Sequence, residues 1–214
     1  MDDRYLYEEE YFSERSYGLD EKRRYQYKLD CENVKKRASG KSILDIGCGL
    51  GLFLDEFDDS WFKLGIEPSN YASAVCTKKH ICILEPDQVI PGVYDVVVLR
   101  GTLQHIYNPI ETLDLATRAL RSGGLLAILA TPNTDSLGYL RWGTLPALDA
   151  PRNWIPFGKK MLKNILNRLD YREIDITLPY GKPYANPVKD LYKFIIGKPT
   201  AFPGNMMDVY AWKR

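Results

Sequence analysis

The chain has 214 residues, of which 45% are hydrophobic and 27% charged, and its formal net charge at pH 7 is +1. This is the composition of one globular domain with a sizeable core. The small net charge gives no strong field that would recruit nucleic acid or an anionic membrane, and no apolar run reaches the length of a membrane span. The sequence gives no indication of oligomeric state.

The expected compartment is the cytoplasm. The first ten residues, MDDRYLYEEE, lack the basic start and the apolar stretch of a secretory signal. The four cysteines, Cys31, Cys48, Cys76 and Cys82, show no C-x-x-C pairing. We interpret them as free thiols in a reducing compartment.

Stretches with strand and helix character alternate from residue 41 to residue 133, after a polar segment that predicts one helix over residues 20–38. Strands are expected at 41–47, 61–67, 80–84, 94–100 and 125–133. Helices are expected at 52–57, at 69–79 with Ser69 as cap, and at 108–124, closed by Gly123 and Gly124. Apolar strands alternating with helices predict an α/β fold with a doubly wound, mostly parallel sheet and helices on both faces.

The pattern loosens after Asn133. Residues 134–157 are aromatic and rich in proline and glycine without a clear period, so we expect a long binding loop there. A helix over 159–170, a strand over 171–178 and a final strand over 206–213 follow, and residues 179–205 form an insertion with one helix. We therefore expect an N-terminal helical lid or cap over 1–40 and one domain over 41–214, with substrate loops at 134–157 and 179–205.

The most informative stretch is ILDIGCGLG, residues 43–51. It departs from the dinucleotide pattern G-x-G-x-x-G, because Leu52 stands where the third glycine would fall, and Asp45 would repel a phosphate. Glu67 follows Gly47 by 20 residues, a distance that suits an acid bonding ribose hydroxyls. The turn therefore predicts a nucleoside with ribose but no pyrophosphate. S-adenosylmethionine fits, with its ammonium near Asp45, whereas a nicotinamide-dependent oxidoreductase is the disfavoured alternative.

The motifs LDIGCGLG, GIEPS, YDVVVLRGTLQHIYNP and RALRSGGLLAILATPN follow one another from residue 43 to residue 133. In order and spacing they resemble the successive motifs of class I S-adenosylmethionine-dependent methyltransferases. Within that superfamily the chain is most similar to small-molecule methyltransferases, including those of ubiquinone biosynthesis and of surface-polysaccharide or natural-product clusters. The resemblance implies a Rossmann-like fold with a seven-stranded sheet, S-adenosylmethionine as cofactor and a small-molecule methyl acceptor.

The resemblance also implies which residues surround the cofactor. The segment EEEYFSERSYG is similar to the tyrosine-containing lead-in of this group, which would close over the cofactor, although its aromatic residues could equally just pack the segment on the domain. Arg100 could instead be an ordinary ion-pair partner or a clamp for a substrate carboxylate or phosphate. The implied set is Tyr11, Tyr17, Asp45, Gly47, Cys48, Gly49, Gly51, Glu67, Pro68, Ser69, Asp87, Gln88, Leu99 and Arg100.

Candidate acceptor residues come from two segments. His105 matches the histidine of the family's L-E-H segment, where it would be a general base or would hold the loop by hydrogen bonding. Gln104 replaces the common glutamate, so no metal is expected. APRNWIPFGKKMLKNIL resembles the family's segment before the last helix; Arg152 and Trp154 are candidate substrate residues there, and Asn153 replaces the usual histidine.

The predicted reaction is methyl transfer from S-adenosylmethionine to a small molecule, with a hydroxyl oxygen of a sugar, glycan or other metabolite as the favoured acceptor. Methylation of a nitrogen or carbon acceptor is the nearest alternative, because fold and cofactor would be the same. A cofactor-binding partner protein without catalysis is the alternative from another class.

Overall fold

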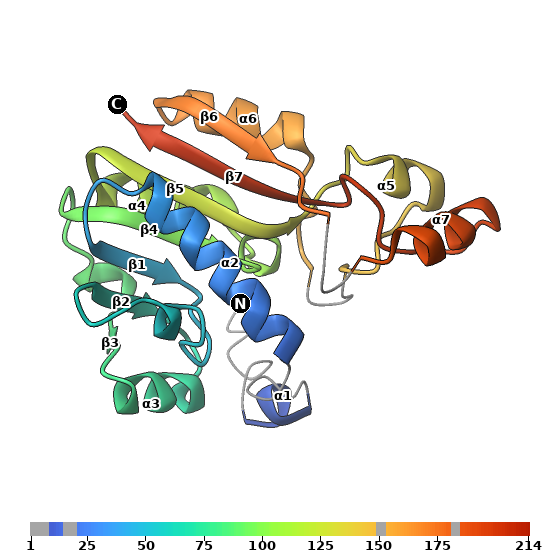
Figure 1. The fold of residues 1–214 in the computed structure, drawn as a ribbon. Coiled ribbons are helices and arrows are strands. Elements are labelled where there is room, and N and C mark those ends of the chain that lie inside the picture. The colour runs from blue at the N-terminus through green and yellow to red at the C-terminus, as the bar shows by residue number, and fades with distance from the viewer. Residues whose placement is uncertain (1–8, 15–20, 149–152, 181–184) are drawn as a thin grey trace. The chain divides into compact units, whose positions relative to one another are not determined.

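The computed structural model describes residues 9–14, 21–148, 153–180 and 185–214. Its strands are β1 (Ser42–Ile46), β2 (Phe62–Ile66), β3 (Cys82–Ile83), β4 (Tyr94–Arg100), β5 (Leu120–Pro132), β6 (Tyr171–Thr177) and β7 (Met206–Lys213). They form one seven-stranded sheet in the order β3-β2-β1-β4-β5-β7-β6 (Figure 1). β1 is parallel to β2 and β4, and β2 to β3, whereas β6 and β7 are antiparallel. The predicted seven-stranded, mostly parallel sheet is confirmed.

The helices and 3-10 turns connect these strands. They are α1 (Glu9–Glu14), α2 (Glu21–Arg37), η2 (Leu54–Glu56), α3 (Asn70–Lys78), η3 (Pro86–Gln88), η4 (Leu103–His105), α4 (Pro109–Ala119), α5 (Leu137–Trp142), α6 (Lys159–Arg168) and α7 (Pro187–Ile195). The chain divides into two compact units, a first unit of Met1–Leu99 with Arg118–Leu125 and a second unit of Arg100–Thr117 with Leu126–Arg214. No helix within the described ranges is long and apolar enough to cross a membrane.

In the first unit, the prediction of a helix over residues 52–57 is wrong, because only the 3-10 turn η2 forms there. Phe53, Phe57 and Trp61 are all buried and pack edge to face, with ring centroids 5.3 Å apart for the first pair and 4.8 Å for the second. Phe57 has extended backbone, which brings Trp61 into the same cluster directly before β2 begins. Burial of the aromatic side chains therefore takes precedence over a regular helix.

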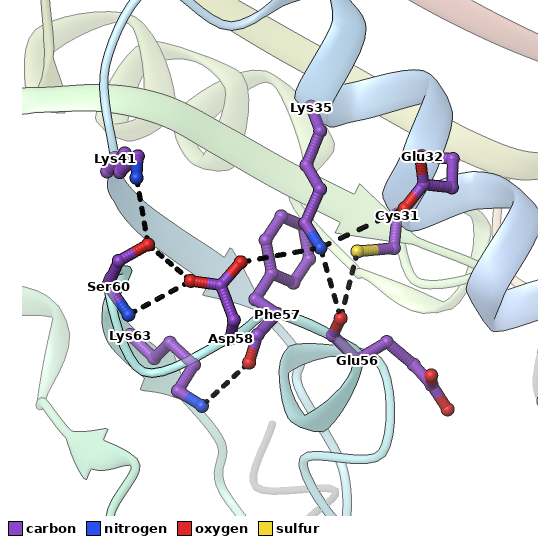
Figure 2. Close-up of polar contacts among 9 residues, drawn as sticks. All are labelled: Cys31, Glu32, Lys35, Lys41, Glu56, Phe57, Asp58, Ser60 and Lys63. Atoms are coloured by element: carbon purple, nitrogen blue, oxygen red, sulfur yellow. Dashed lines mark hydrogen bonds and ion pairs between the residues drawn. The ribbon is translucent and has the colours of Figure 1, made fainter.

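The long helix α2 confirms the helix predicted over 20–38 and is anchored to η2 (Figure 2). The Glu56 carbonyl accepts hydrogen bonds from Cys31 Sγ at 3.3 Å and from Lys35 Nζ at 3.4 Å. Burial raises the pKa of the Cys31 thiol to about 11, although nearby Lys35 opposes this, so the thiol stays protonated and can donate. Lys35 also lies over the Phe57 ring, 5.4 Å from its centroid. These contacts hold α2 beside the segment that follows the glycine turn.

The helix expected over 108–124 ends earlier, at Ala119, and the chain from Leu120 onward belongs to β5. Arg121 Nε donates to Asp95 Oδ1 at 2.6 Å, and this ion pair holds the segment against the start of β4. A Cβ added at Gly124 would lie 3.2 Å from the Tyr94 carbonyl oxygen, so this glycine permits close approach of the two backbones. Gly123 and Gly124 thus serve strand pairing rather than the end of a helix.

The Asp95 carboxylate should stabilise the first unit at neutral pH. Its burial raises the pKa, but hydrogen bonds from Arg121 and Ser42 lower it further, so the net pKa lies below the usual value of 3.8. The stabilisation is therefore present above the unfolded pKa and is lost as pH falls through the lower folded pKa. We expect Asp95→Asn to lose roughly 1–3 kcal/mol of unfolding free energy at pH 7, and the deficit should shrink below about pH 4.

Urea unfolding at both pH values measures this deficit, with the exposed Asp59→Asn as the control for loss of one charge. A deficit that stays constant down to pH 3 would contradict the ionic explanation.

In the second unit, residues 134–157 contain a helix, α5, that the sequence did not predict. Ser136 caps it by accepting a hydrogen bond from the Tyr139 amide at 3.1 Å, and Gly143 ends it with φ of 65°. The helix has six residues, too few for a helical period to be recognised. The other expected elements of this unit, α6, β6, α7 and β7, are confirmed.

Candidate cofactor site

The glycine turn after β1 has the backbone conformation that glycine permits. Gly47, Gly49 and Gly51 have φ angles of 78°, 54° and 69°. The amides of Gly47 and Cys48 donate to the Ile66 carbonyl at 2.8 and 3.2 Å, which ties the turn to the end of β2. Because the carboxyl ends of parallel β1 and β2 meet at one edge, the turn lies where open α/β sheets bind ligands.

Glu67 lies directly after β2 and holds the turn. Its Oε2 accepts from the Gly49 amide at 2.8 Å and its Oε1 from the Ser69 amide at 2.9 Å. Burial raises the pKa of Glu67 above its usual value, and the two amide hydrogen bonds oppose that rise. A carboxylate has about four acceptor positions, so two more remain on these oxygens for ligand hydroxyls.

Asp45 supplies a second carboxylate at this edge. It is 2% exposed within β1, where it is in register with Gly65 of β2 and Val98 of β4. Asp45 and Glu67 both contribute to raising the pKa of the nearby Cys48 thiol, after its hydrogen bond with Cys76 and its burial. Two carboxylates around one glycine turn favour a ligand that carries positive charge and disfavour a phosphate.

The cysteines contribute more to the turn than the sequence indicated. Cys76 of α3 is completely buried and its thiol donates to the Gly49 carbonyl at 3.1 Å. Cys48 Sγ lies 4.0 Å from Cys76 Sγ, and a Cβ added at Gly65 would collide with the Cys48 sulfur. No sequence spacing links Cys76 to the turn, because the contact is made by the packing of α3. All four cysteines are free thiols in the structure.

An aromatic side chain of α1 packs onto the turn. Phe12 is 5% exposed, and a Cβ added at Gly49 would lie 3.7 Å from its ring. Its ring stacks on Tyr71 of α3 with centroids 6.0 Å apart and packs edge to face with Tyr11, with centroids 5.0 Å apart. Among the described residues of α1, Phe12 therefore reaches the turn, whereas the sequence singled out Tyr11 and Tyr17 as cofactor residues. Tyr17 lies outside the described residues.

The remaining predicted cofactor residues of the first unit occupy varied positions. Ser69 caps α3 by accepting from the Ala72 amide at 3.2 Å, as predicted, and Pro68 beside it is exposed. Asp87 is exposed in η3, where the Gln88 side chain accepts from the Glu85 amide at 2.8 Å. Leu99, near the end of β4, is fully buried. Contacts of these residues with adenine or the sulfonium stay predictions.

The predicted acceptor residues belong to the second unit, as does Arg100, which the resemblance implies as a cofactor residue. Arg100 ends β4 and His105 ends η4, where its amide donates to the Thr102 carbonyl at 2.8 Å. The Gln104 carbonyl accepts from the Trp154 amide at 2.8 Å, and Trp154 packs edge to face with Tyr107, with ring centroids 5.6 Å apart. The loop that contains His105 and the segment that contains Trp154 are therefore adjacent. Arg152 lies outside the described residues.

The chemistry of these groups fits the cofactor that the sequence suggested. The Glu67 oxygens have acceptor positions for ribose hydroxyls, Asp45 can balance an ammonium, and the glycine turn presents backbone without side chains. Within the ranges that the structure describes, no three His, Cys, Asp or Glu residues are grouped to hold a metal ion.

The sheet order and the site together define a Rossmann-like protein of the class I methyltransferase type. Residues 19–175 match the methyltransferase domain family, which is most of the chain. The chain therefore belongs to this family, and it is identified as a class I S-adenosylmethionine-dependent methyltransferase.

Curated relatives are named ubiquinone biosynthesis O-methyltransferases. The protein of Nitrosospira multiformis is 26% identical over 174 residues, which cover 73% of this chain and 71% of that protein. The protein of Maricaulis maris is 28% identical over 184 residues, which cover 76% of this chain and 68% of that protein. The match to the protein of Pectobacterium carotovorum, 25% identical, covers 42% of this chain and only 44% of that protein. The chain thus matches less than half the length of several of these relatives.

Solved structures support the fold. An S-adenosylmethionine-dependent methyltransferase of Archaeoglobus fulgidus has a TM-score of 0.65 at 19% identity, covering 99% of this chain and all of that one. A protein of Thermotoga maritima, described as a possible histamine N-methyltransferase, has a TM-score of 0.66 at 17% identity. The match covers 89% of this chain and 90% of that one. At these identities the likeness extends to the fold alone.

Proposed function

We propose that the chain binds S-adenosylmethionine at the glycine turn and transfers its methyl group to a hydroxyl oxygen of a small molecule. The observation that carries the proposal is the position of the Glu67 carboxylate. It accepts a hydrogen bond from the Gly49 amide at 2.8 Å, and it lies at the same sheet edge as buried Asp45. The names of the curated relatives, all O-methyltransferases, support an oxygen acceptor.

Within this proposal, the residues of the first unit hold and orient the cofactor. Glu67 would accept hydrogen bonds from the ribose hydroxyls, and Asp45 would face the ammonium directly or through water. S-adenosylmethionine supplies, when bound, a methyl group already activated by its sulfonium. The chain's own task is then positioning, which can contribute roughly 7–11 kcal/mol in favourable cases.

His105 would act on the acceptor. A hydroxyl must lose its proton as it accepts the methyl group, and an imidazole is suited to remove that proton near neutral pH. The relatives' names favour a phenolic hydroxyl of a quinone precursor as the first acceptor class to test. The sugar and glycan hydroxyls suggested by the sequence remain the second class. A cytoplasmic location rests on the sequence alone.

The test of cofactor binding is calorimetric titration of the purified chain with S-adenosylmethionine and S-adenosylhomocysteine. Micromolar binding is expected. A folded protein, free of co-purified cofactor, that binds neither compound would refute the assignment of the glycine turn and would revive the nicotinamide alternative.

Replacement of His105 by alanine is expected to lower kcat by about 10²–10⁴-fold, because the proton acceptor is lost. The affinity for S-adenosylmethionine should change little, since no cofactor role is assigned to His105. Steady-state kinetics with the identified acceptor, together with calorimetry, separates the two effects.

The matched control is His80→Ala, which removes the chain's other, exposed histidine. Unchanged turnover in His105→Ala would remove the residue from the chemistry and would favour an amine acceptor. Tight cofactor binding without turnover on any acceptor, in a protein that co-purifies with a partner, would favour a silent partner protein.

A further inference from the structure

Helix α7 in the second unit has three distinct faces. Its inner face, Asp190 and Phe194, attaches it to the unit: the Asp190 carboxylate accepts from Thr200 Oγ1 at 2.6 Å and from the Asn186 amide at 2.8 Å. The Phe194 ring stacks on Phe202 with centroids 4.4 Å apart. The helix is therefore held in place by its own unit.

The outer face of α7 is apolar and exposed. Val188, Leu191, Tyr192 and Ile195 are spaced as neighbours along one side of a helix, and their exposed fractions are 82%, 55%, 63% and 67%. Helix α5 lies beside α7, because Trp142 and Phe194 pack edge to face with ring centroids 5.4 Å apart (Figure 1). Helix α5 also carries exposed Leu137 and Leu140. Exposed apolar side chains gathered in this way mark interaction surfaces.

Charge distinguishes the candidate partners of this outer face. Lys189 and Lys193 form one flank of α7, and Lys198 follows its end. Asp190 is the sole acidic residue between 185 and 203, and it is 6% exposed. In a contact between this face and the same face of a second copy, residues 185–203 would supply no exposed acidic side chain to pair with the lysines. An anionic lipid bilayer offers both an apolar interior and opposite charge.

We propose that the outer face of α7 docks the protein on the surface of a membrane that contains anionic phospholipids. The apolar side chains would enter the boundary between head groups and acyl chains, while the lysines contact lipid phosphates. Because α7 is already folded and fixed by its inner face, docking requires no coupled folding. This is surface attachment, and it is independent of the proposed reaction.

The test is co-sedimentation of the full chain with vesicles of phosphatidylcholine containing phosphatidylglycerol, compared with vesicles of phosphatidylcholine alone. Binding is expected to the anionic vesicles, weaker at high salt. The double variant Leu191→Glu/Ile195→Glu should reduce the partition coefficient for the anionic vesicles by about tenfold or more. The matched control Ile110→Glu/Met161→Glu changes two similarly exposed apolar residues of α4 and α6 and should bind as the unmodified protein does.

The charge contribution has its own pair of variants. Lys189→Ser/Lys193→Ser should reduce binding by roughly 10–30-fold at low salt, at about fivefold per lysine. Lys160→Ser/Lys163→Ser on α6 is the control of equal charge. Thermal melting followed by circular dichroism identifies any variant that does not fold. If the double glutamate variant does not fold, Leu191→Ser is the milder replacement for the outer face.

Equal binding of the outer-face variants and their controls would overturn the proposal, as would absence of vesicle binding. Light scattering after size-exclusion chromatography measures the oligomeric state and so tests the competing explanation, a dimer formed through this face. A dimer that the α7 variants dissociate, without vesicle binding, would assign the face to a second copy of the chain. None of these readouts uses the cofactor, so failure here leaves the proposed methyl transfer untouched.

Discussion

Replacing Glu67 with alanine is expected to weaken binding of S-adenosylmethionine by about 10²-fold or more. In the structure this carboxylate bonds the amides of Gly49 and Ser69, and we assign its remaining acceptor positions to the ribose. Hydrogen bonds to a charged group contribute roughly 1.5–3 kcal/mol each, and the variant would lose those to ribose as well as the support of the turn. Calorimetric titration measures the loss directly.

The control for this variant is Asp59→Ala, which removes an exposed carboxylate of the same unit. The variant Glu67→Gln separates loss of the charge from loss of the side chain, because it keeps the size of the side chain but turns one acceptor into a donor. An affinity unchanged in Glu67→Ala would refute the ribose assignment.

The affinity of the unmodified protein should also depend on pH through Glu67. Burial raises the pKa of this carboxyl, so the ionised, better acceptor is present above the raised value and is lost as pH falls through it. We therefore expect affinity to decrease on acidification from pH 7, and the Glu67→Gln variant to lack this component. The same pH dependence in both proteins would show that another group is responsible.

The second large effect is expected for Gly51→Ala. Its φ of 69° costs an L-residue about 1–2 kcal/mol, and the added Cβ would lie 2.5 Å from Ile81 Cδ1 and 3.0 Å from Cys76 Sγ. Overpacking of this kind typically adds about 1–3 kcal/mol. The variant should therefore lose several kcal/mol of unfolding free energy, measured by urea denaturation, and bind the cofactor more weakly because the turn must shift.

Gly92→Ala is the matched control in the same unit. Gly92 has a similar φ of 73°, but a Cβ added there would have nothing within 4 Å. It should therefore show the backbone cost alone, and the difference between the two variants measures the crowding beneath the turn. Equal losses in the two variants would mean that the contacts with Ile81 and Cys76 are relieved without cost.

Several features of this protein could be predicted from local sequence because they depend on short-range physical preferences. The β-branched run at 94–100 has a strong strand preference, and Ser69 before a helical stretch is a cap wherever the helix packs. Asp45 lies near the end of one apolar run and Glu67 directly follows another, which places both at the carboxyl edge of a parallel sheet. These features were sufficient for the fold class and the cofactor.

Other features depended on contacts between residues far apart in the chain. The helix expected over 52–57 became a 3-10 turn, and its flanking aromatic residues pack on α2: Phe53 contacts Tyr27 and Phe57 lies under Lys35. The helix expected to reach Gly124 stopped at Ala119, and the Arg121–Asp95 ion pair holds the following residues in the strand segment. Local propensity cannot anticipate such contacts, since tertiary packing routinely overrides it.

The sequence by itself determined the class of fold and the cofactor, and it predicted the two carboxylates that would receive the cofactor. Periodicity, capping and glycine spacing are local properties of the chain. Only the tertiary structure decided that Cys76 and Phe12 support the glycine turn, that Trp154 lies beside the His105 loop, and that α7 exposes an apolar face. Each of these depends on how segments distant in the chain pack against one another.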